Sequence, residues 1–251
     1  MTRPLSGRVA VVTGASRGLG RAIALALAEA GADVSVAARA KTDLEETAHQ
    51  AGQHGVRTLA LPTDVASYPA VERLMAQTAN ELGGLDIVVN NAGIARVAPL
   101  AEAPLDDWQA ILDVNLSGVF YGCRAAAPHL IRRKAGKVIN LASVLAAVAL
   151  PGYTMYAATK GAVITLTRTL AVEWARHNIQ VNAIAPGWFV TDMNEAAFAD
   201  PAIHGRLTRD IPARRTGRPE EIGPLAVYLA SPGSGFMTGQ TIFLDGGQTV
   251  A

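Results

Sequence analysis

RVAVVTGASRGLG, the sequence of residues 8–20, joins a short apolar run to a turn that contains three glycines. The run from Arg8 to Val12 is rich in β-branched residues, as in a buried strand, and the segment from Arg21 to Ala30 after the turn is rich in Ala and Leu. Gly31 is a natural end for the helix predicted there. Such a strand, glycine-rich turn and helix can bind a pyrophosphate through backbone N–H groups at the helix N-terminus. The spacing Gly14-x3-Gly18-x-Gly20 departs from the G-x-G-x-x-G fingerprint of dinucleotide sites, so a plain tight connection stays open as an alternative.

Short apolar runs alternate with helix-length segments along the rest of the chain. This alternation predicts βαβ units and a parallel sheet, and no linker, repeat or low-complexity segment divides the 251 residues. We therefore expect one α/β domain over residues 1–251. The runs predicted as strands are Arg8–Thr13, Val34–Ala38, Thr58–Leu61, Leu85–Val89, Val138–Leu141, Gln180–Ile184 and Thr241–Leu244.

The composition argues against several classes of protein. A formal net charge of +1 does not favour a dedicated nucleic-acid binder, so the expected partners are small molecules. The single cysteine, Cys123, excludes an intramolecular disulfide and fits a core position in a protein of a reducing compartment. The histidines lack His-x3-His spacing, and no Gly-x-Ser-x-Gly elbow is present, so we predict neither a metal site nor a serine hydrolase.

No segment is predicted to cross or enter a membrane. The N-terminus lacks an apolar signal sequence, and the most apolar stretch, Leu141–Leu150, ends at Pro151 and is too short to span a bilayer. The expected location is the cytoplasm.

Tyr156 and Lys160 are four residues apart, so on a helix their side chains share one face. A neighbouring ammonium favours the phenolate and lowers the pKa of a phenol from its usual value of about 10, which would make the pair an acid/base. Ser143, thirteen residues upstream of Tyr156, could hydrogen-bond the oxygen of a carbonyl or alcohol. None of these groups carries a hydride, so redox chemistry here requires a cofactor. Without the agreement of the N-terminal glycine loop, the spacing of Tyr156 and Lys160 could arise by chance.

The motifs taken together resemble those of the short-chain dehydrogenases/reductases, in the short, single-domain type. They follow the order of that family and cover nearly the whole chain. The resemblance implies a Rossmann-type fold, which is a doubly wound parallel sheet of about seven strands with helices on both faces. The matching motifs are Thr13-Gly14-x3-Gly18-x-Gly20, Asp64-Val65, Asn90-Asn91-Ala92-Gly93, Asn115, Ser143, Tyr156-x3-Lys160, Pro186-Gly187 and Thr191.

The resemblance also implies the roles of the catalytic residues. Tyr156 would donate the proton in reduction, Ser143 would polarise the carbonyl oxygen, and Lys160 would lower the pKa of Tyr156 while it binds the nicotinamide ribose. Asn115 would hold a water that links Lys160 to solvent.

The cofactor residues follow from the same resemblance. Asp64 and Val65 would contact adenine, the segment around Asn91 would pass close to the adenosine ribose, and Thr191 would lie against the nicotinamide carboxamide. The full set expected to bind the cofactor is Gly14, Ser16, Arg17, Gly18, Leu19, Gly20, Ala38, Arg39, Asp64, Val65, Asn91, Ala92, Gly93, Tyr156, Lys160, Pro186, Gly187 and Thr191.

The end of the second strand bears on the choice of cofactor. An acidic residue there bonds the ribose 2′-hydroxyl of NAD, whereas a basic residue accommodates the 2′-phosphate of NADP. Ala38 takes the place of the acid, Arg39 follows it, Arg17 lies in the glycine loop, and Asp33 lies at the wrong end of the strand. Because guanidinium groups suit a phosphate, we expect NADP(H) to be preferred, with NAD(H) as the alternative.

Apolar side chains predict the character of the substrate. Apolar residues follow Ser143, and the expected substrate contacts favour an at least partly apolar carbonyl compound. Residues 190–215, which Pro201, Gly205 and Pro212 interrupt, are predicted to form a substrate lid. The residues expected at the substrate are Ser143, Leu145, Tyr153, Tyr156, Trp188, Phe189 and Met193.

Two closer resemblances stay open. Much of the chain is similar to 3-oxoacyl-[acyl-carrier-protein] reductases, whose acidic carrier would suit a basic patch beside the site, although ordinary helix-end cations explain such a patch equally well. The segments Pro186–Phe189 and Ile211–Arg215 are also similar to gluconate and other sugar or polyol dehydrogenases. We favour an oxoacyl or general ketone reductase. The basic patch expected for the oxoacyl reductase would consist of Arg132, Arg133, Lys134, Arg176 and His177.

A different class of function is a non-catalytic NADP-binding sensor or scaffold, which predicts damage to the catalytic set, and the sequence shows none. Enoyl reductases of the same superfamily space Tyr and Lys more widely.

Association is also expected, because Leu105–Arg133 and Tyr156–His177 are predicted as long helices with apolar residues on more than one face. In the resembling family such helices form one subunit interface and the C-terminal segment, here Thr238–Ala251, forms another, which implies a homotetramer.

Overall fold

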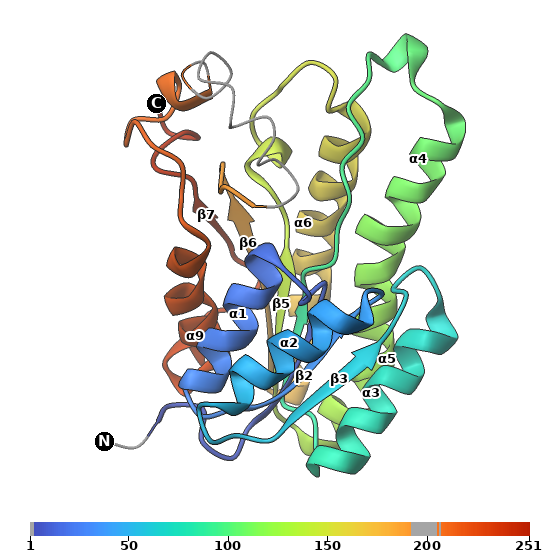
Figure 1. Ribbon diagram of the computed structural model, residues 1–251, viewed down its shortest axis with the longest axis vertical. Helices are drawn as coiled ribbons and strands as arrows, with labels where there is room; N and C mark the ends of the chain where they lie inside the picture. Colours follow the sequence, from blue (N-terminus) through green and yellow to red (C-terminus); the bar gives the residue numbers. More distant parts are fainter. Residues whose placement is uncertain (1–2, 192–204, 206) are drawn as a thin grey trace.

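A parallel sheet of seven strands forms the centre of the molecule, in the order β3-β2-β1-β4-β5-β6-β7 (Figure 1). The computed structural model describes residues 3–191, 205 and 207–251. Each neighbouring pair of strands is parallel, so the predicted doubly wound α/β architecture is confirmed. The strands are β1 (Val9–Thr13), β2 (Asp33–Ala38), β3 (Thr58–Pro62), β4 (Ile87–Asn90), β5 (Gly136–Leu141), β6 (Ile179–Pro186) and β7 (Thr241–Leu244).

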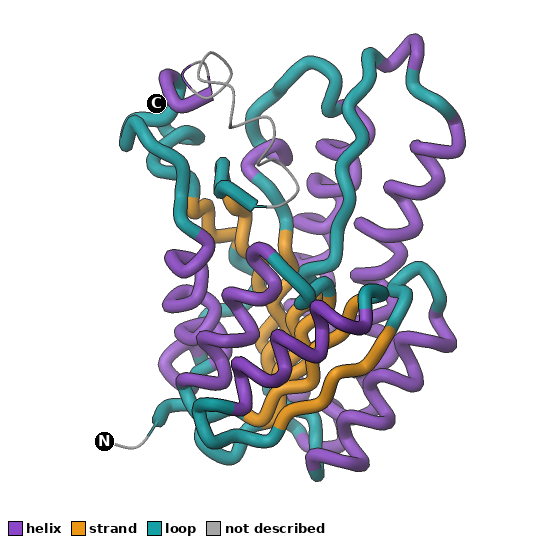
Figure 2. Tube along the Cα trace, in the orientation of Figure 1, coloured by secondary structure: helices purple, strands orange, loops and turns teal. Residues whose placement is uncertain are grey.

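Helices cover both faces of the sheet (Figure 2). Helices α1, α2 and α9 pack on one face, and α3, α5 and α6 pack on the other. The helices are α1 (Gly18–Glu29), α2 (Lys41–Gly52), α3 (Tyr68–Leu82), α4 (Leu105–Leu112), α5 (Gly118–Arg133), α6 (Thr154–Trp174) and α9 (Gly223–Ala230). Short 3-10 turns lie at Leu100–Glu102, Val144–Ala146, Ala175–His177, Pro219–Ile222 and Pro232–Ser234.

Strand β1 shows why these runs are apolar throughout. Side chains alternate between the two faces of a strand, so Val12 packs with the core beneath α1 and Val11 packs with the core beneath α3 and α5. A parallel sheet with helices on both faces buries both sets. The carboxyl ends of β1 and β4 meet where the strand order reverses direction, which is where α/β sheets bind ligands.

The predicted helix over residues 105–133 differs from the observed one. Helix α4 passes into a π-helical turn, Asp113–Ser117, before α5 begins at Gly118. The N–H of Gly118 bonds the carbonyl of Asp113, five residues back, so the turn holds one more residue than an α-helical turn. The extra residue turns Asn115 fully into the interior.

Two further sequence expectations concern the interior and membranes. Cys123 is buried in the core, as predicted, and burial raises the pKa of its thiol to about 12. Among the described residues, none of the helices combines the length and apolar character needed to cross a bilayer.

Candidate active site

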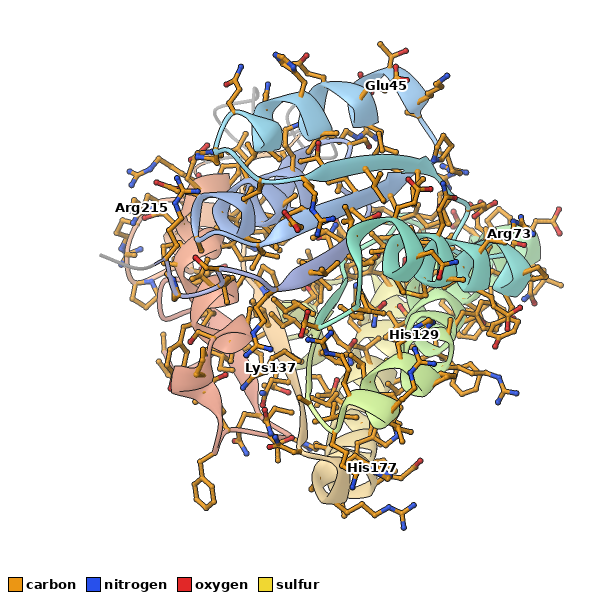
Figure 3. The ribbon with its side chains drawn as sticks, turned by 90° about the horizontal axis from the view of Figure 1, so that it is seen from below. Glu45, Arg73, His129, Lys137, His177 and Arg215 are labelled. Carbon is orange, nitrogen blue, oxygen red and sulfur yellow. The ribbon has the colours of Figure 1, made fainter. Side chains whose placement is uncertain are left out.

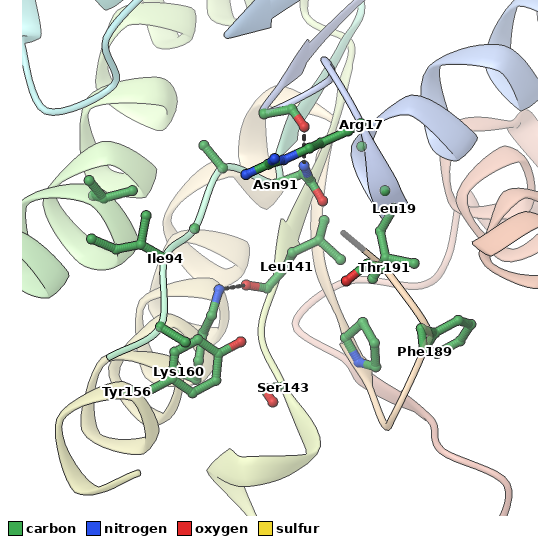
Figure 4. Close-up of a pocket in the computed structure, with 18 of the residues that line it drawn as sticks. Arg17, Leu19, Asn91, Ile94, Leu141, Ser143, Tyr156, Lys160, Phe189 and Thr191 are labelled. Carbon is green, nitrogen blue, oxygen red and sulfur yellow. Dashed lines mark hydrogen bonds between the residues drawn. The ribbon is translucent and has the colours of Figure 1, made fainter. Parts of the chain in front are cut away.

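A cavity of about 550 Å³ runs along the carboxyl ends of β1, β2, β4, β5 and β6 (Figure 4). Every residue expected to bind the cofactor lines this cavity, from Gly14 in the first loop to Thr191 after β6. The expected substrate residues Ser143, Leu145, Tyr153, Tyr156, Trp188 and Phe189 line it as well. Met193 lies outside the described residues, as does most of the predicted lid over residues 190–215.

The glycines of the first loop are required by close packing within the protein. Gly14 has a φ of +65°, and a Cβ there would lie 2.7 Å from the Cα of Ala92. A Cβ on Gly20 would overlap the carbonyl of Gly14. The unusual spacing of these glycines therefore lets the loop after β1, the loop after β4 and the start of α1 meet at one point.

Thr13 and Asn91 hold the first two loops together. The Thr13 hydroxyl accepts hydrogen bonds from the backbone N–H of Asn91 (3.0 Å) and of Ala92 (3.2 Å). The Asn91 Nδ2 donates in return to the carbonyls of Thr13 (2.8 Å) and Gly14 (3.1 Å). These reciprocal bonds satisfy backbone groups of both loops and fix the floor of the cavity.

Two arginines reach one end of the cavity. Arg17 precedes the first residue of α1, and Arg39 follows the last residue of β2, and both line the cavity with exposed side chains. Asp33 lies at the other end of β2, where it pairs with Arg57 at 2.6 Å. The first turn of α1 contains no acidic side chain. Asp43 at the start of α2 also lines the cavity, but the two guanidinium groups and the N-terminus of α1 together suit this corner to an anion.

Ser143, Tyr156 and Lys160 converge at the other end (Figure 4). Ser143 follows β5, and its hydroxyl accepts a hydrogen bond from the N–H of Leu145 at 3.2 Å. Lys160 is buried, and its Nζ donates to the carbonyl of Leu141 (2.7 Å) and lies 5.6 Å from the centre of the Tyr156 ring. The i, i+4 spacing on α6 thus places the ammonium and the phenol side by side.

The pKa of Tyr156 departs from the sequence prediction. We expected Lys160 to lower it, whereas burial raises the pKa of the phenol above its ordinary value, and the hydroxyl of Ser143 offsets only part of that rise. Burial also lowers the pKa of Lys160 to about 8. Desolvation is the largest cause of both pKa shifts, because burial disfavours the charged form of each group. The phenol is therefore held in its protonated form, which is the form that can donate a proton.

Asn115 does not line the cavity but supports its wall. Its Oδ1 accepts from the N–H of Ile94 (2.8 Å), and its Nδ2 donates to the carbonyl of Ile94 (2.9 Å). Nδ2 also contacts the hydroxyl of Thr159 at 3.4 Å, next to Lys160. The carboxamide thus joins the loop after β4 to α6, and one lone pair of Oδ1 is left for the predicted water.

Aromatic rings form one wall at this end of the cavity. The ring of Tyr153 meets the ring of Tyr156 edge-on at 6.5 Å between centres, and it meets the ring of Trp188 at 6.3 Å. Phe189 is buried and forms a bridge with Gly217, where any Cβ would strike the Phe189 ring. The remaining surface here is mostly aliphatic, so the wall is largely apolar.

The basic patch lies at the wrong end of the molecule for the predicted role. Arg133 ends α5, and Arg176 and His177 follow α6, at the amino ends of the strands, which Figure 3 views from below. Arg176 is twenty residues from Tyr156 along α6 and its 3-10 extension, which is roughly 30 Å at 1.5 Å per residue. Arg133 also pairs with the buried Asp86 at 2.9 Å. The expectation of a patch beside this chain's own site is wrong.

Some lining residues carry no signal in the sequence. Ile94 and Val97 belong to an irregular segment, and Leu141 contributes a carbonyl that any residue could supply. Only the three-dimensional arrangement identifies them. The lining residues that were not predicted include Ala40, Asp43, Thr63, Ile94, Ala95, Val97, Val114, Leu141 and Ala142. Within the described ranges, no group of three or more His, Cys, Asp or Glu side chains is placed to hold a metal ion.

Known proteins resemble this chain over its whole length. Residues 14–249 match a family model described as enoyl-(acyl carrier protein) reductase. A gluconate 5-dehydrogenase of Gluconobacter oxydans is 41% identical over 247 residues, which cover 98% of this chain and 96% of that protein. A 3-oxoacyl-[acyl-carrier-protein] reductase of a Synechocystis species is 39% identical over 248 residues, with 98% of each chain covered.

A solved structure is equally similar. The crystal structure of a gluconate 5-dehydrogenase from Burkholderia cenocepacia J2315, in complex with NADP and tartrate, is 42% identical to this chain. The alignment covers 100% of this chain and 98% of that one, with a TM-score of 0.95. Relatives with different named substrates are thus about equally close, so similarity alone does not select a substrate.

Proposed function

We propose, on the premise that the chain belongs to the short-chain dehydrogenase/reductase family, that it reversibly reduces a ketone to a secondary alcohol with NADP(H). One observation carries the proposal. Ser143, Tyr156 and Lys160 meet at one end of a single cavity whose other end holds the glycine loop, Arg17 and Arg39. A cavity with these two ends suits a molecule that has an anionic group at one end and a reactive group at the other.

The residues divide the work between binding and proton transfer. The bound nicotinamide supplies the hydride. Ser143 donates a hydrogen bond to the carbonyl oxygen of the substrate and holds it near the phenol of Tyr156. Tyr156 donates its proton to that oxygen as the alcohol forms, and the raised pKa of the phenol keeps the proton available at neutral pH. Lys160 stabilises the resulting phenolate across the 5.6 Å that separate Nζ from the ring centre.

NADP(H) is the cofactor that the charged corner supports. Arg17 and Arg39 supply two guanidinium groups, and Ala38 supplies no acid that would compete with a phosphate. The similar Burkholderia cenocepacia structure contains NADP, which agrees with this choice.

An apolar ketone is the substrate class that the wall supports best. Around Ser143 and Tyr156 the described lining is aliphatic or aromatic, and Lys160 is its only cation at this end. A sugar acid brings a carboxylate that needs a partner of its own. Gluconate or 5-keto-gluconate stays the second candidate, because relatives with that activity are as similar as the oxoacyl reductases. Enoyl reduction is not supported, since Tyr156 and Lys160 are only four residues apart.

Further parts of the proposal concern the state of the protein. The complete catalytic set argues against a purely NADP-binding sensor or scaffold. We also propose a homotetramer in the cytoplasm, and the exposed apolar side chains on α5 and α6 support the association. An acyl-carrier protein as partner is not supported within one chain, because the basic patch lies far from Tyr156.

Activity measurements on Tyr156→Phe test the proposal. The purified protein is assayed by NADPH absorbance with a 3-oxoacyl thioester, an apolar cyclic ketone and 5-keto-gluconate. We expect turnover of an apolar ketone, and Tyr156→Phe should lower kcat at least about 100-fold, the usual effect of removing a general acid. NADPH should still bind.

Tyr228→Phe is the matched control, because Tyr228 is exposed on α9, far from the cavity lining, and it should keep normal activity. Near-normal turnover by Tyr156→Phe would refute the assigned chemistry. Turnover of 5-keto-gluconate alone would make the second candidate the correct one.

A further inference from the structure

Arg21 forms a hydrogen-bonded brace on the outer side of the glycine loop. The residue lies in the first turns of α1 and its side chain is partly buried. Its Nε donates to the hydroxyl of Thr47 (2.9 Å) on α2, and its Nη2 donates to the carbonyls of Ser16 and of Asp43 (3.3 Å). One guanidinium therefore ties the glycine loop to helix α2.

The two points that Arg21 ties together adjoin the two arginines of the charged corner. The carbonyl of Ser16 belongs to the same planar peptide as the N–H of Arg17, so holding that carbonyl sets the direction in which Arg17 leaves the loop. On the other side, Asp43 lies in the first turn of α2, which begins at Lys41, two residues after Arg39. The brace thus links the loop that carries Arg17 to the helix that begins just after Arg39.

Arg21 acts from outside the cavity. It does not line the cavity that holds Arg17 and Arg39, and instead lines an adjoining hollow between α1 and α9, on the other side of Gly18 and Thr191. Its guanidinium bonds neutral oxygens, and within the described residues no carboxylate pairs with it. A direct contact with the cofactor is therefore not its role.

General adhesion between α1 and α2 does not require this cation. Apolar residues of both helices, such as Leu27 and Leu44, already share one core cluster. Thr47, the acceptor on α2, is fully buried, and its hydroxyl donates a hydrogen bond to the carbonyl of Asp43 at 3.0 Å, so the acceptors are themselves held in place. Only the fork of an arginine presents donors in two directions to reach both sides.

We propose that Arg21 is a positioning residue that sets the spacing of Arg17 and Arg39 and thereby the preference for a dinucleotide with a phosphate on its adenosine ribose. This inference rests on the proposed NADP(H) site. The loss of Arg21 should affect the charged corner more than the rest of the cavity, because other elements hold the reacting groups Ser143, Tyr156 and Lys160.

Binding of NADPH and NADH to Arg21→Met measures the effect. Nucleotide fluorescence should show the Kd for NADPH rising about tenfold or more, which is the loss of one well-placed charged contact, while the Kd for NADH rises less than about threefold. The kcat at saturating NADPH should stay within about twofold, since catalysis does not depend on this corner. Arg21→Lys should recover only part of the affinity, because an ammonium cannot reach both sides.

Matched variants separate the possible failures. Arg73→Met removes an exposed arginine on α3, away from the cavity lining, and should change neither Kd. Thr47→Val, which removes one acceptor, should show part of the Arg21→Met effect and add little to it in the double variant. Thermal melts identify any variant that is not folded at the assay temperature.

Arg39→Ala tests the corner itself. If Arg39→Ala leaves the preference for NADPH unchanged, the proposed site for the extra phosphate is wrong, and the proposed role of Arg21 is then wrong as well. If Arg39→Ala lowers that preference but Arg21→Met weakens both nucleotides equally, or neither, the site stands and the positioning role of Arg21 is overturned.

Discussion

Lys160 shows at the level of one residue how the site differs from its sequence motif. The motif places an ammonium beside a phenol, and the fold buries the ammonium of Lys160 while Tyr156 is half-buried. Burial lowers the pKa of Lys160 to about 8, because the one bond to the carbonyl of Leu141 replaces only part of the lost hydration. A charged Lys160 is therefore held at a cost to stability, as expected for a functional group.

The stability of the cofactor-free protein should reveal this cost as a function of pH. Below about pH 8 Lys160 is charged in both states, and between about 8 and 10.5 only the unfolded state holds the extra proton, so stability rises with pH in this window. The variant Lys160→Met carries no such penalty. We therefore compare the free energy of unfolding of Lys160→Met with that of the natural protein at each pH. The variant's value minus the natural protein's value should be about 2–3 kcal/mol larger at pH 7 than at pH 10.5.

Denaturant unfolding at the two pH values measures that difference. Lys41→Met, at an exposed position on α2, is the control, and its difference from the natural protein should change by less than about 0.5 kcal/mol. A difference for Lys160→Met that is constant with pH would contradict the account of a buried, destabilised ammonium.

The π-helical turn between α4 and α5 has its effect at the level of elements. An ordinary α-helix through residues 113–117 would turn Asn115 to another direction, since one residue corresponds to about 100° of rotation. The extra residue instead points the carboxamide at Ile94, where it satisfies both the N–H and the carbonyl of a loop residue that lines the cavity. π-turns of this kind are frequent at functional sites.

Asn115→Ala should therefore damage both stability and activity. The substitution leaves two backbone groups of Ile94 without partners, so the free energy of unfolding should fall by about 2–4 kcal/mol. The kcat should also fall, because the loop after β4 loses its link to α6. Chemical denaturation and the ketone assay measure the two effects. Asn80→Ala, on the exposed face of α3, is the control, and equal behaviour of the two variants would refute the clamp.

Exposed apolar side chains on the helices concern the whole molecule. Val172 on α6 is 81% exposed, and Phe120 on α5 is 47% exposed. Both helices already pack their other faces on the sheet. Large exposed apolar groups on sheet-covering helices are typical of surfaces between subunits.

Val172→Glu should weaken the proposed association. A carboxylate brought into an apolar interface loses its hydration without a partner, so the mass measured by light scattering at micromolar concentration should fall from that of a tetramer toward that of a smaller species. Asn80→Glu adds the same charge to α3 and should leave the mass unchanged. A natural protein that is already monomeric under these conditions would contradict the proposal.

Much of the fold followed from local pattern alone. The seven strands and their parallel pairing were predictable because each run is apolar and alternates with helix-length segments, and the five inner strands are buried on both faces. The positions that line the cavity were largely predictable too, since glycines 14, 18 and 20 and the Tyr156–Lys160 spacing belong to short motifs. Strand ends were less accurate, as with β6, which continues to Pro186.

Tertiary structure alone set the environment of those residues. The brace from Arg21 to Thr47, the bonds between Asn91 and Thr13, and the π-turn beneath Ile94 join segments far apart in the chain, so no local pattern encodes them. The pKa of Tyr156 differed from its prediction for the same reason, because desolvation depends on everything packed around the phenol. The amino-acid sequence thus determined which groups are present and on which element each lies. Packing decided their distances, protonation and exposure, since these depend on contacts between distant parts of the chain.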